Sequence, residues 1–365
     1  MSSPSPDEGS PVTASGCYSH PFWLANKSKP TEYWDYENSV LDFSSIEPYE
    51  CIQKIGRGKY SEVFRGRNRN NGEICVIKVL KPVKTKKIHR EITILQNLYG
   101  GPNVVRLLDV AQEPQTETPV LVFENVDSQD FRTLYPKLSS FDIRYYMYEI
   151  LRTLHFAHSM GIFHRDIKPH NVMIDPTQRK VRVIDWGLGE YYHHGTGYNV
   201  RVASRYYKGP ELLVGHRMYD YSLDVWSLGC VLAGILFRKE PFFQGKDNID
   251  QLVQIANVLG KDDLLAYCKK YKIKLDREFD ELIVKQNKPK VTFQQLVTPS
   301  VAKMCEPVAL DLLSRMLVYD HQERILPHEA MAHPYFDPIR AEAAATAAAA
   351  AARSATHHNE ASSVL

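Results

Sequence analysis

The sequence lacks a hydrophobic run long enough to cross a bilayer. Its longest apolar stretch, Val225–Phe237, is interrupted by Ser227, whereas a membrane-spanning helix needs about 20 apolar residues. The N-terminus has no hydrophobic signal core, and its Asp7-Glu8 pair without an arginine is not typical of a transit peptide. We therefore expect a protein of the cytoplasm and nucleus that has no membrane partner.

Cysteine pairs and a strong net charge are missing as well. The six cysteines are dispersed, with no CxxC pair and no histidine spacing suited to zinc. This pattern is typical of reduced intracellular thiols rather than of a disulfide framework. The formal net charge of +2 is too small to indicate nucleic-acid binding by itself. Any basic function must therefore come from local clusters of lysine and arginine.

The order of the expected elements indicates an α+β protein with two lobes. At 365 residues the chain is longer than one typical domain, and its strand-like patterns precede its helical ones. The expected strands are Tyr49–Ile55, Ser61–Arg67, Ile74–Leu80, Val104–Val110 and Val120–Phe123. The predicted division is a mobile tail at 1–32, an N-terminal segment at 33–44, a β-rich N-lobe at 45–123, a hinge at 124–128, a helical C-lobe at 129–337 and an alanine-rich tail at 338–365.

Two carboxylates and one amide stand at separations that suit phosphoryl transfer. Asp166, in a His-Arg-Asp triplet, begins a loop that reaches Asn171, and Asp185 follows an apolar strand. Asp166 is placed to receive the proton of an attacking hydroxyl, while Asn171 and Asp185 supply oxygen ligands for Mg²⁺. These residues predict an ATP- and Mg²⁺-dependent transfer of phosphate to a hydroxyl.

A glycine-rich turn lies between the first two expected strands. Gly56 and Gly58 let backbone amides approach phosphate oxygens without a Cβ in the way. Ser61 stands where the usual loop has a third glycine, which leaves the turn less flexible. The other residues that we expect around the nucleotide in this loop are Arg57, Lys59, Tyr60, Ser61 and Val63.

Lys78 is the expected phosphate ligand of the third strand. A lysine among apolar strand residues is more often an edge or snorkelling residue. Glu91 changes that balance because it shares one helical face with Ile88 and Ile92, and an inward carboxylate needs a cationic partner. We expect the backbone of Glu124–Val126 to contact adenine. The remaining nucleotide-site candidates are Val76, Phe123, Glu124, Val126 and Ile184.

Three further residues are expected to brace the C-lobe. Asp224 opens the buried run and is interpreted as a support for the catalytic loop. Glu211 and Arg324 are candidates for an ion pair, although their sequence separation alone gives little support. Upstream of them, Ser139 and Asp142 have the spacing of a capping box that begins a helix ending at Gly161.

With these motifs in order, the sequence resembles the eukaryotic protein kinases over about residues 45–337. Within them it is similar to the catalytic α subunits of casein kinase II. Trp186, where most kinases have phenylalanine, and Gly209, in the Gly-Pro-Glu form of the APE motif, are the most specific signals. The other segments that carry the resemblance are Gly56–Phe64, Lys81–Lys84, Asp166–Asn171 with His170, Val200–Tyr206 and Tyr33–Glu37.

The resemblance implies a bilobal eukaryotic protein kinase fold and a kinase that phosphorylates Ser or Thr followed by acidic residues. ATP or GTP would be the donor, and Lys168 also fits Ser/Thr rather than tyrosine kinases. It implies constitutive activity, with Tyr33–Glu37 packed on residues 185–211, here called the activation segment. It further implies a regulatory β subunit in a tetrameric holoenzyme. The residues implied to meet acidic substrates are Lys59, Lys84, Lys86, Lys87, Arg90, Arg201, Arg205 and Lys208.

The sequence departs from the family pattern at a few positions. Thr85 and His89 stand where lysine is usual, which weakens the expected acidic selectivity. Arg67 and Arg69 lie where apolar residues usually face the β subunit, and Cys51 replaces a larger aliphatic side chain there. A charge buried in that interface would be costly. Another departure, expected to be minor, is Gly189 in place of alanine.

Five alternatives compete with this interpretation. Thr196-Gly197-Tyr198 resembles the lip of MAP kinases, which are activated by phosphorylation and directed by proline, but it lies 15 residues before Glu211, three too many. A scaffold pseudokinase would lack Lys78 or one of the catalytic residues, and all are present. The basic run Lys81–Arg90 is also compatible with a solvated helix or a nuclear localisation signal. It lacks the aromatic or arginine-rich interleaving of a nucleic-acid site, so we expect no nucleic acid.

Overall fold

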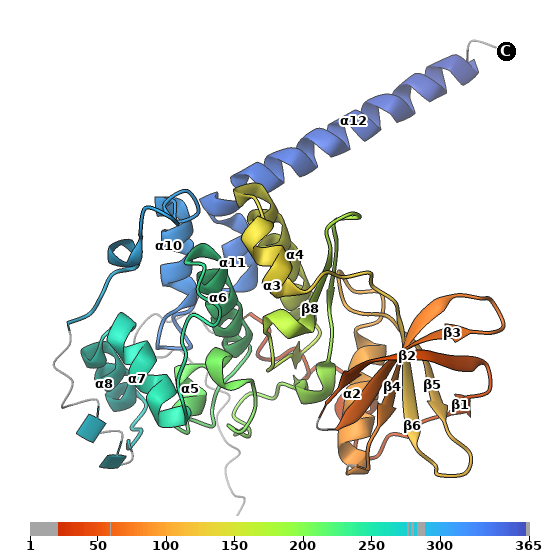
Figure 1. The fold of residues 1–365 in the computed structure, drawn as a ribbon, viewed down its shortest axis with the longest axis horizontal. Coiled ribbons are helices and arrows are strands. Elements are labelled where there is room, and N and C mark those ends of the chain that lie inside the picture. Colours follow the sequence, from red (N-terminus) through yellow and green to blue (C-terminus); the bar gives the residue numbers. More distant parts are fainter. Residues whose placement is uncertain are drawn as a thin grey trace, which may run out of the picture.

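The computed structural model describes residues 21–58, 60–82, 84–275, 277–278, 281–282 and 289–362, with side chains up to residue 349. A six-stranded sheet and one long helix form an N-lobe, and helices form most of the C-lobe (Figure 1). The predicted α+β architecture with a β-rich and a helical lobe is therefore confirmed.

The N-lobe sheet has the strand order β1-β5-β6-β4-β3-β2. Short connections join the antiparallel neighbours β2–β3, β3–β4 and β5–β6, whereas β4 pairs with β6 although α2 and β5 lie between them in the chain. The strands are β1 (Ser44–Ser45), β2 (Tyr49–Arg57), β3 (Ser61–Asn68), β4 (Ile74–Leu80), β5 (Leu107–Gln112) and β6 (Pro119–Glu124). Helix α2 (Thr85–Asn97) follows β4 and buries the predicted stripe that includes Ile88, Glu91 and Ile92.

One strand differs from its prediction. We expected Val104–Val110, but β5 begins only at Leu107. The preceding residues pair elsewhere: Val104 forms an isolated parallel bridge with Val183, and the amide of Val105 donates to the carbonyl of Val183 at 3.2 Å. The apolar character of this segment thus serves a contact with the C-lobe, which a single-sequence pattern does not reveal.

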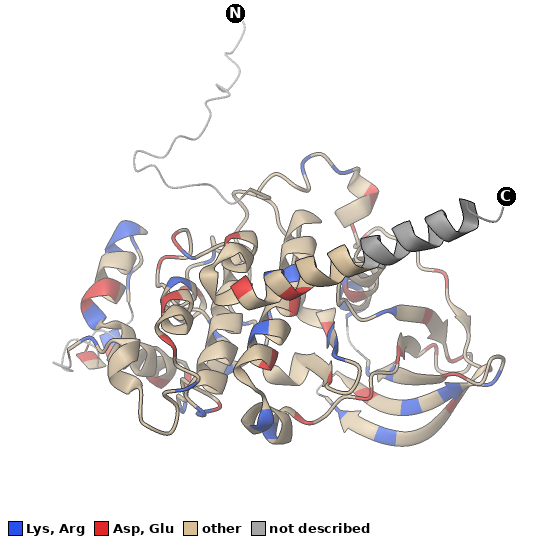
Figure 2. Cartoon of the chain, turned by 90° about the horizontal axis from the view of Figure 1, so that it is seen from above, with Lys and Arg blue, Asp and Glu red and all other residues tan. Residues whose placement is uncertain are grey.

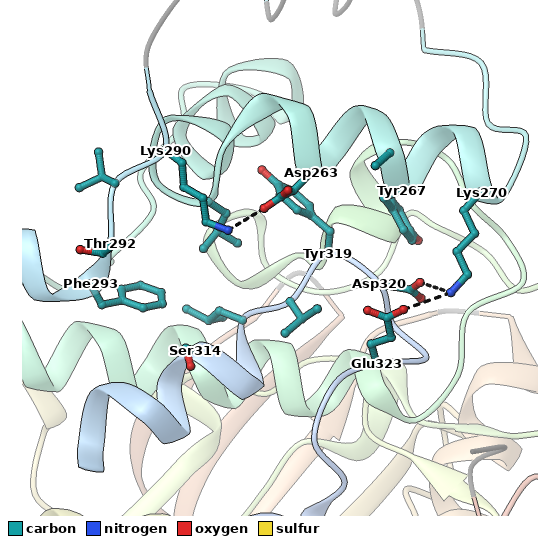
Figure 3. A pocket seen from close by; sticks show the side chains of 15 residues that line it. Asp263, Tyr267, Lys270, Lys290, Thr292, Phe293, Ser314, Tyr319, Asp320 and Glu323 are labelled. Carbon is teal, nitrogen blue, oxygen red and sulfur yellow. Dashed lines mark hydrogen bonds and ion pairs between the residues drawn. The ribbon is translucent and has the colours of Figure 1, made fainter. Parts of the chain in front are cut away.

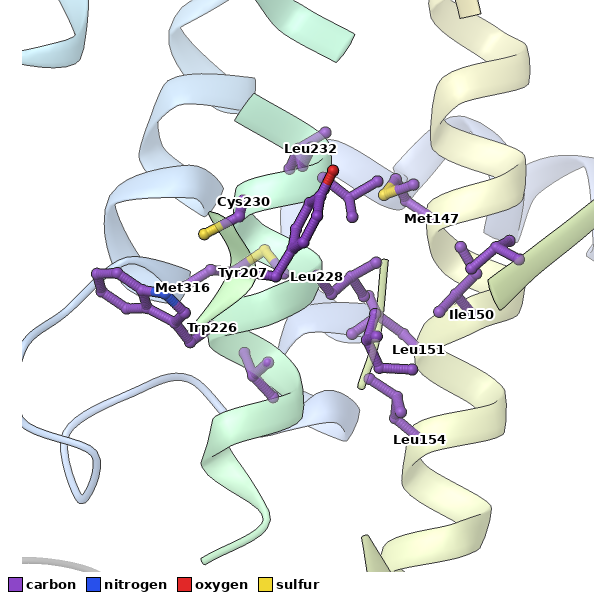
Figure 4. Close-up of a cluster of buried hydrophobic side chains, with 14 of the residues drawn as sticks. Met147, Ile150, Leu151, Leu154, Tyr207, Trp226, Leu228, Cys230, Leu232 and Met316 are labelled. Carbon is purple, nitrogen blue, oxygen red and sulfur yellow. The ribbon is translucent and has the colours of Figure 1, made fainter. Parts of the chain in front are cut away.

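The C-lobe core is built around two long helices. Helix α4 (Ser140–Ser159) begins at the predicted capping box, in which the Ser139 hydroxyl accepts from the amide of Asp142 and the Asp142 carboxylate accepts from that of Ser139. Helix α6 (Ser222–Leu236) is buried at every position. Figure 4 shows Met147, Ile150, Leu151 and Leu154 of α4 lying toward Leu228 of α6.

The remaining C-lobe elements surround this core. Two small two-stranded sheets flank the catalytic loop and the residue Asp185: β7 (Ile162–Phe163) pairs with β10 (Glu190–Tyr191), and the hairpin of β8 (Val172–Asp175) and β9 (Lys180–Val183) lies between them in the chain. The other helices are α3 (Phe131–Leu134), α5 (Pro210–Leu213), α7 (Asn248–Leu259), α8 (Lys261–Lys270), α10 (Pro307–Met316), α11 (Pro327–Ala332) and α12 (Asp337–Ser362).

Part of the predicted N-terminal tail is packed on the C-lobe. Residues 1–20 lie outside the described residues, but 21–30 form turns and α1 (Thr31–Trp34) follows. Asn26 is buried and donates to the carbonyls of Gly161 at 2.7 Å and Tyr192 at 3.0 Å. The predicted boundary at residue 32 therefore needs correction, because an asparagine that bonds to distant backbone leaves no local sequence signal.

The alanine-rich tail continues as helix α12, which projects from the body of the protein (Figure 1). Its residues 341–349 are exposed. Alanine has the highest helix propensity but buries little surface, so this segment forms helix without a packed face. Among the described residues, no helix combines the length and apolarity needed to cross a membrane.

Candidate active site

The catalytic loop brings the predicted base and amide together. Asn171 donates through Nδ2 to the carbonyl of Asp166 at 2.8 Å and to its carboxylate at 3.1 Å. Lys168 Nζ donates to the same carboxylate at 2.7 Å. Asp166 is only 5% exposed, so its orientation is set by these bonds. The carboxylate is thereby held in one position as an acceptor for a hydroxyl proton.

Ser204 is a site residue that the sequence reasoning did not single out. Its amide donates to Asp166 Oδ1 at 2.9 Å, and its hydroxyl lies 3.1 Å from the same oxygen. Lys168 Nζ donates to the Ser204 hydroxyl at 2.9 Å. The activation segment is thus bonded directly to the catalytic loop. The only available signal was the position of Ser204 in a family-like stretch, since 38 residues separate it from Asp166.

Asp224 supports the catalytic loop as predicted. Its buried carboxylate accepts from the amides of His164 and Arg165, each at 2.8 Å, and lies 2.9 Å from Nε2 of His158. Burial alone would raise the pKa of Asp224, but the hydrogen bond and charge of His158 keep it below its ordinary value. One carboxylate on α6, that of Asp224, therefore fixes the backbone of the catalytic loop.

The second predicted brace also forms. Arg324 donates to both carboxylate oxygens of Glu211, at 2.7 and 2.6 Å, and both side chains are fully buried. The same guanidinium reaches the carbonyls of Val318, Tyr319 and Ser222. A buried ion pair needs such additional bonds to offset the loss of hydration. This pair joins the end of the activation segment to the rest of the C-lobe.

Lys78 contacts both predicted carboxylates. Its Nζ lies 2.6 Å from Glu91 Oε1 and 3.1 Å from Asp185 Oδ1. Burial by itself would lower the pKa of Lys78, but the two carboxylates outweigh burial and raise it above its ordinary value. Burial would likewise raise the pKa of Asp185, and Lys78 holds it below the usual range. The lysine is therefore charged and the aspartate ionised, as phosphate and metal binding require.

The residues predicted to hold Mg²⁺ fit that ion chemically. Asp185 has a left-handed backbone conformation (φ 60°), and its side chain is 48% exposed, unlike the buried Asp166. Asn171 uses its amide nitrogen for Asp166, which leaves its oxygen as a ligand. Mg²⁺ usually binds through one or two protein oxygens together with substrate phosphates. Two oxygen ligands beside a lysine match that pattern.

The glycine loop forms the β2–β3 turn. The amide of Gly58 donates to the Ser61 carbonyl at 2.8 Å, and Lys81 Nζ donates to the Gly58 carbonyl at 2.9 Å. Among the described residues, a Cβ built on Gly56 or Gly58 would meet no atom closer than 3.5 Å, so space rather than crowding surrounds both backbones there. Arg57 and Tyr60 are exposed, whereas the predicted Lys59 lies outside the described residues.

The apolar candidates lie on neighbouring strands. Val63 of β3 pairs directly with Lys78, and Val76 of β4 pairs with Phe123 of β6. Ile184 is half-buried and its amide donates to the Asn171 carbonyl at 2.9 Å. The structure thus brings these apolar residues to the strands and loop that carry the polar ones.

The hinge prediction needs one refinement. Glu124 does not present its side chain to solvent: the side chain is 4% exposed and bonds to Lys180 at 2.9 Å and Arg182 at 2.7 Å. Its amide donates to the Arg106 carbonyl, and the Val126 carbonyl accepts from Ser128. The side chain of Glu124 is therefore a structural anchor, and adenine contact from this residue is restricted to its remaining backbone group.

The predicted substrate cations divide into two groups. Lys84, Lys86 and Lys87 are exposed at the start of α2, and Arg201 and Arg205 are exposed on the activation segment. Lys86 pairs with Glu37, and Lys87 lies 4.8 Å from the centre of the Tyr60 ring.

Arg90 and Lys208 form the second group, whose side chains are engaged within the protein, and Arg90 corrects the prediction of an exposed substrate contact. Its side chain is 12% exposed, pairs with Glu190 at 2.7 Å and donates to the Gly187 carbonyl at 3.0 Å. Lys208 is half-buried and donates to the Val202 carbonyl. Burial lowers the pKa of Lys208. Arg90 is therefore an internal tie rather than an exposed substrate contact, because helical position alone does not show which way a long side chain turns.

A groove of about 460 Å³ lies between the N-terminal segment, α2 and the activation segment. Lys87 and Arg201 line it, together with Trp34, whose indole Nε1 is buried without a hydrogen-bond partner among the described residues. Elsewhere Lys, Arg, Asp and Glu are interspersed over both lobes (Figure 2). The charged residues that line the groove are of both signs: Lys87, Arg90, Arg165 and Arg201 stand beside Asp35, Glu37 and Glu190.

A slightly larger cavity, of about 500 Å³, lies in the C-lobe between α8 and α10. Figure 3 shows Lys290 paired with Asp263 on one side and Lys270 paired with Asp320 and Glu323 on the other. None of its lining residues belongs to the predicted site. Its size therefore says nothing about where the chemistry occurs.

The order and geometry of these groups agree with a comparison to known families. A lysine paired with a helix carboxylate, a base on a loop, an amide and a second carboxylate are the parts that protein kinases use. The family model described as "Protein kinase domain" matches residues 49–336, well over half of the chain. The chain therefore belongs to the protein kinase family.

Proposed function

We propose that this protein kinase is a constitutively active Ser/Thr kinase that phosphorylates residues followed by acidic side chains, with ATP or GTP as donor. The exposed cations on both sides of the groove carry the proposal for acidic substrates. Lys84 is the N-cap of α2, Lys86 and Lys87 lie in its first turn, and Arg201 and Arg205 lie on the activation segment; of these, Lys87 and Arg201 line the groove. Clustered cations attract anionic peptides locally, in a manner that salt weakens.

The chemistry follows from the residues already placed. Asp166 receives the proton of the substrate hydroxyl, and Lys168, bonded to it at 2.7 Å, stabilises negative charge beside the transferred group. Lys78 binds donor phosphates, and Asn171 and Asp185 hold Mg²⁺. Mg²⁺, when bound, neutralises charge on the phosphate oxygens. Lys168 also contacts Ser204 of the activation segment, so the substrate-binding segment and the base share one partner.

Constitutive activity is supported by Glu190, whose carboxylate contacts two arginines at once. Glu190 Oε2 lies 2.7 Å from Arg90 and 3.3 Å from Arg165, the arginine beside the catalytic aspartate. In many kinases a phosphorylated residue orders the activation segment through such arginines. Here Glu190 provides the negative charge within the chain itself. Rings of the N-terminal segment add to this order, with Tyr36 stacked on Tyr191 and Trp34 edge-on to His193.

The proline-directed alternative is less well supported by the position of Tyr198. This tyrosine is 7% exposed, its hydroxyl accepts from the amide of His193 at 2.6 Å, and it donates to the Tyr191 carbonyl at 3.2 Å. A kinase would have to break these contacts before it could phosphorylate the residue. The scaffold alternative is disfavoured because Lys78, Asp166, Asn171 and Asp185 are brought into contacts suited to catalysis.

A regulatory β subunit remains a further part of the proposal. Cys51 and Arg67 are exposed on the N-lobe sheet, and Arg69 lies 3.6 Å from Glu50 in a pair that is exposed on both sides. A partner that covers this surface would have to accommodate these charges. A location in the cytoplasm and nucleus, where acidic protein substrates are available, is proposed with it.

The experiment is a peptide phosphorylation assay with two donors. Purified chain, before and after phosphatase treatment, is given serine peptides followed either by acidic residues or by proline, with Mg²⁺ and ATP or GTP. We expect preference for the acidic peptide, use of both donors and no loss after phosphatase. Preference for the proline peptide, or loss of most activity after phosphatase, would contradict the proposal.

A matched pair of variants tests the cations. Lys84→Glu with Lys87→Glu should raise KM for the acidic peptide by about tenfold while KM for ATP stays constant, since each close charge contact contributes about 1 kcal/mol or less at an exposed site. Lys269→Glu with Lys272→Glu, which reverses two exposed lysines at and just after the end of α8, is the control with the same charge change and should leave both constants unchanged. An equal effect of the two variants would show that net charge, not this surface, attracts the peptide.

A further inference from the structure

The side chain of Glu124 forms an unusually complete set of contacts for a hinge residue. Oε1 accepts from Arg182 Nε at 2.7 Å and from the Arg106 amide at 3.0 Å, while Oε2 accepts from Lys180 Nζ at 2.9 Å. Arg106 Nε lies 3.7 Å from the same carboxylate. Burial would raise the pKa of Glu124, but Lys180 and Arg182 hold it below its ordinary value. The group is thus an ionised, almost fully enclosed carboxylate.

These partners come from different parts of the fold. Glu124 ends β6 of the N-lobe sheet, whereas Lys180 and Arg182 lie two residues apart on β9 of the C-lobe hairpin. Side chains two residues apart on a strand point to the same face, so β9 presents both cations to one carboxylate. We call Glu124, Lys180 and Arg182 the hinge clamp.

Strand β9 leads directly to the metal-binding residue. Its last residue, Val183, bonds to the N-lobe connection through the Asn103 carbonyl at 2.8 Å and the Val105 amide at 3.2 Å. The next residue, Ile184, bonds to the Asn171 carbonyl at 2.9 Å, and Asp185 follows. A displacement of β9 relative to the hinge would therefore move both predicted magnesium ligands relative to the adenine-binding backbone.

We propose that Glu124 is a positioning residue: through Lys180 and Arg182 it holds the hinge, and Lys78 on the neighbouring strand of the same sheet, in register with Asn171 and Asp185 before nucleotide binds. A nucleotide triphosphate must contact the hinge at one end and Lys78 and Asp185 at the other. Only chains with both ends aligned can bind it fully. When the aligned fraction falls, the apparent dissociation constant rises by the same factor.

This reasoning separates the clamp from a simple hinge contact. Adenosine lacks the phosphates, so it does not require alignment of Asn171 and Asp185 with the hinge. Loss of the clamp should therefore weaken ATP much more than adenosine. ATP and GTP should be weakened by the same factor, because both carry the triphosphate and both span the two ends.

The test uses the full chain and measures binding without turnover. Glu124→Gln keeps the side-chain volume but removes the charge, and Mg²⁺-ATP, Mg²⁺-GTP and adenosine are titrated by calorimetry. We expect the dissociation constants of both triphosphates to rise about fivefold or more, the range of ordinary coupling between sites, and that of adenosine to change less than twofold. Equal weakening of ATP and adenosine, or no weakening of either, overturns the proposal.

Two further variants keep the test decisive if Glu124→Gln folds poorly. Lys180→Gln and Arg182→Gln each leave the carboxylate with its other donors and should show the same selective loss for triphosphates. In the double variant Glu124→Gln/Arg182→Gln the losses of triphosphate affinity should not add, because each single change breaks the same Glu124–Arg182 contact. Additive losses would contradict a shared clamp.

The control removes an ion pair that does not involve the hinge and whose carboxylate, Glu306, is 42% exposed. Arg144, 9% exposed, pairs with Glu306 at 2.8 Å within the C-lobe. Glu306→Gln should lower thermal stability without changing any of the three dissociation constants. With an acidic peptide, Glu124→Gln should raise KM for ATP and leave KM for peptide unchanged. Because the titrations need no phosphorylated product, their failure is distinct from a failure of the proposed peptide specificity.

Discussion

Strand β2, which leads into the glycine loop, and helix α6, which supports the catalytic loop, differ sharply in burial. In β2, only Tyr49 and Gly56 are even half-buried, and Ile52 and Ile55 are 52% and 53% exposed. In α6, below the catalytic loop, all positions are buried. Residues 161–167 of the loop are buried as well. We call α6 together with residues 161–167 the floor of the site, and β2 with the glycine loop its roof. Asp166 thus lies in a densely packed floor, whereas the glycine loop of the roof extends from an edge strand with few neighbours.

This difference assigns separate tasks to the two regions. Segments with few buried contacts open at low free energy, and packed segments open only with global unfolding. The floor holds Asp166 by Asn171, Lys168 and the Asp224-bonded backbone. The roof can move when nucleotide enters or leaves. The base Asp166, whose position must be exact for proton transfer, therefore lies in the rigid floor, and the glycine loop, which must adapt to the nucleotide, lies in the roof.

The largest expected effect comes from removing the base from the floor. Asp166→Asn should lower kcat by about 10³-fold, within the usual range for general-base catalysis, because the amide cannot accept the proton. Steady-state assays with an acidic serine peptide measure this. Thermal unfolding serves as the control and should change little, since asparagine has the same shape. Activity equal to the original protein would refute Asp166 as the base.

A second prediction concerns the rigidity of the floor. Arg324→Met leaves the fully buried Glu211 without its partner and should destabilise the fold by about 3–5 kcal/mol, as expected for an unpaired buried charge. Urea denaturation measures it. Lys290→Met breaks a pair with Asp263 whose side chains are 60% and 55% exposed, and should cost less than about 1 kcal/mol. Similar costs for the two variants would contradict the distinction between a packed floor and an exposed surface.

A third prediction concerns pH and one carboxyl group of the floor. Burial raises the pKa of Glu240 from 4.5 to about 7, although a hydrogen bond from Tyr207 opposes this. Between these two values the folded state binds more protons than the unfolded state. Stability associated with Glu240 is therefore complete below about pH 4.5 and is lost as pH rises toward 7.

Glu240→Gln should remove this loss. Compared with the original protein, the variant should gain about 2.5 kcal/mol between pH 5 and pH 8, given about 1.4 kcal/mol per pKa unit, and thermal unfolding at several pH values measures it. Glu73→Gln, which changes an exposed carboxyl, serves as the control variant. A parallel profile for Glu240→Gln would show that this group does not titrate differently on folding.

The smallest effect is expected in the roof. Ile52→Thr replaces a half-exposed β-branched residue at an irregular position of the β2–β3 register and should change stability by less than about 0.5 kcal/mol. Leu228→Ala in α6, a 0% exposed position, should cost about 2–5 kcal/mol. Equal losses in urea denaturation would mean that β2 is packed more tightly than its exposure indicates.

The sequence by itself determined the elements whose signals are local. The capping box at Ser139, the apolar stripe that carries Glu91 and the loop from Asp166 to Asn171 all depend on short spacings. Each was predicted because periodicity and capping act within a few residues. The match to protein kinases extended these local motifs to the whole domain.

Only the tertiary structure decided how distant polar side chains are shared. It turned Arg90 inward to Glu190, brought Ser204 to Asp166, and enclosed Glu124 between β9 and Arg106. It also placed Asn26 against residues more than 130 positions away. A long side chain can satisfy its charge in several directions with similar energy, and packing of the complete fold selects one of them. That selection leaves no periodic trace in the sequence.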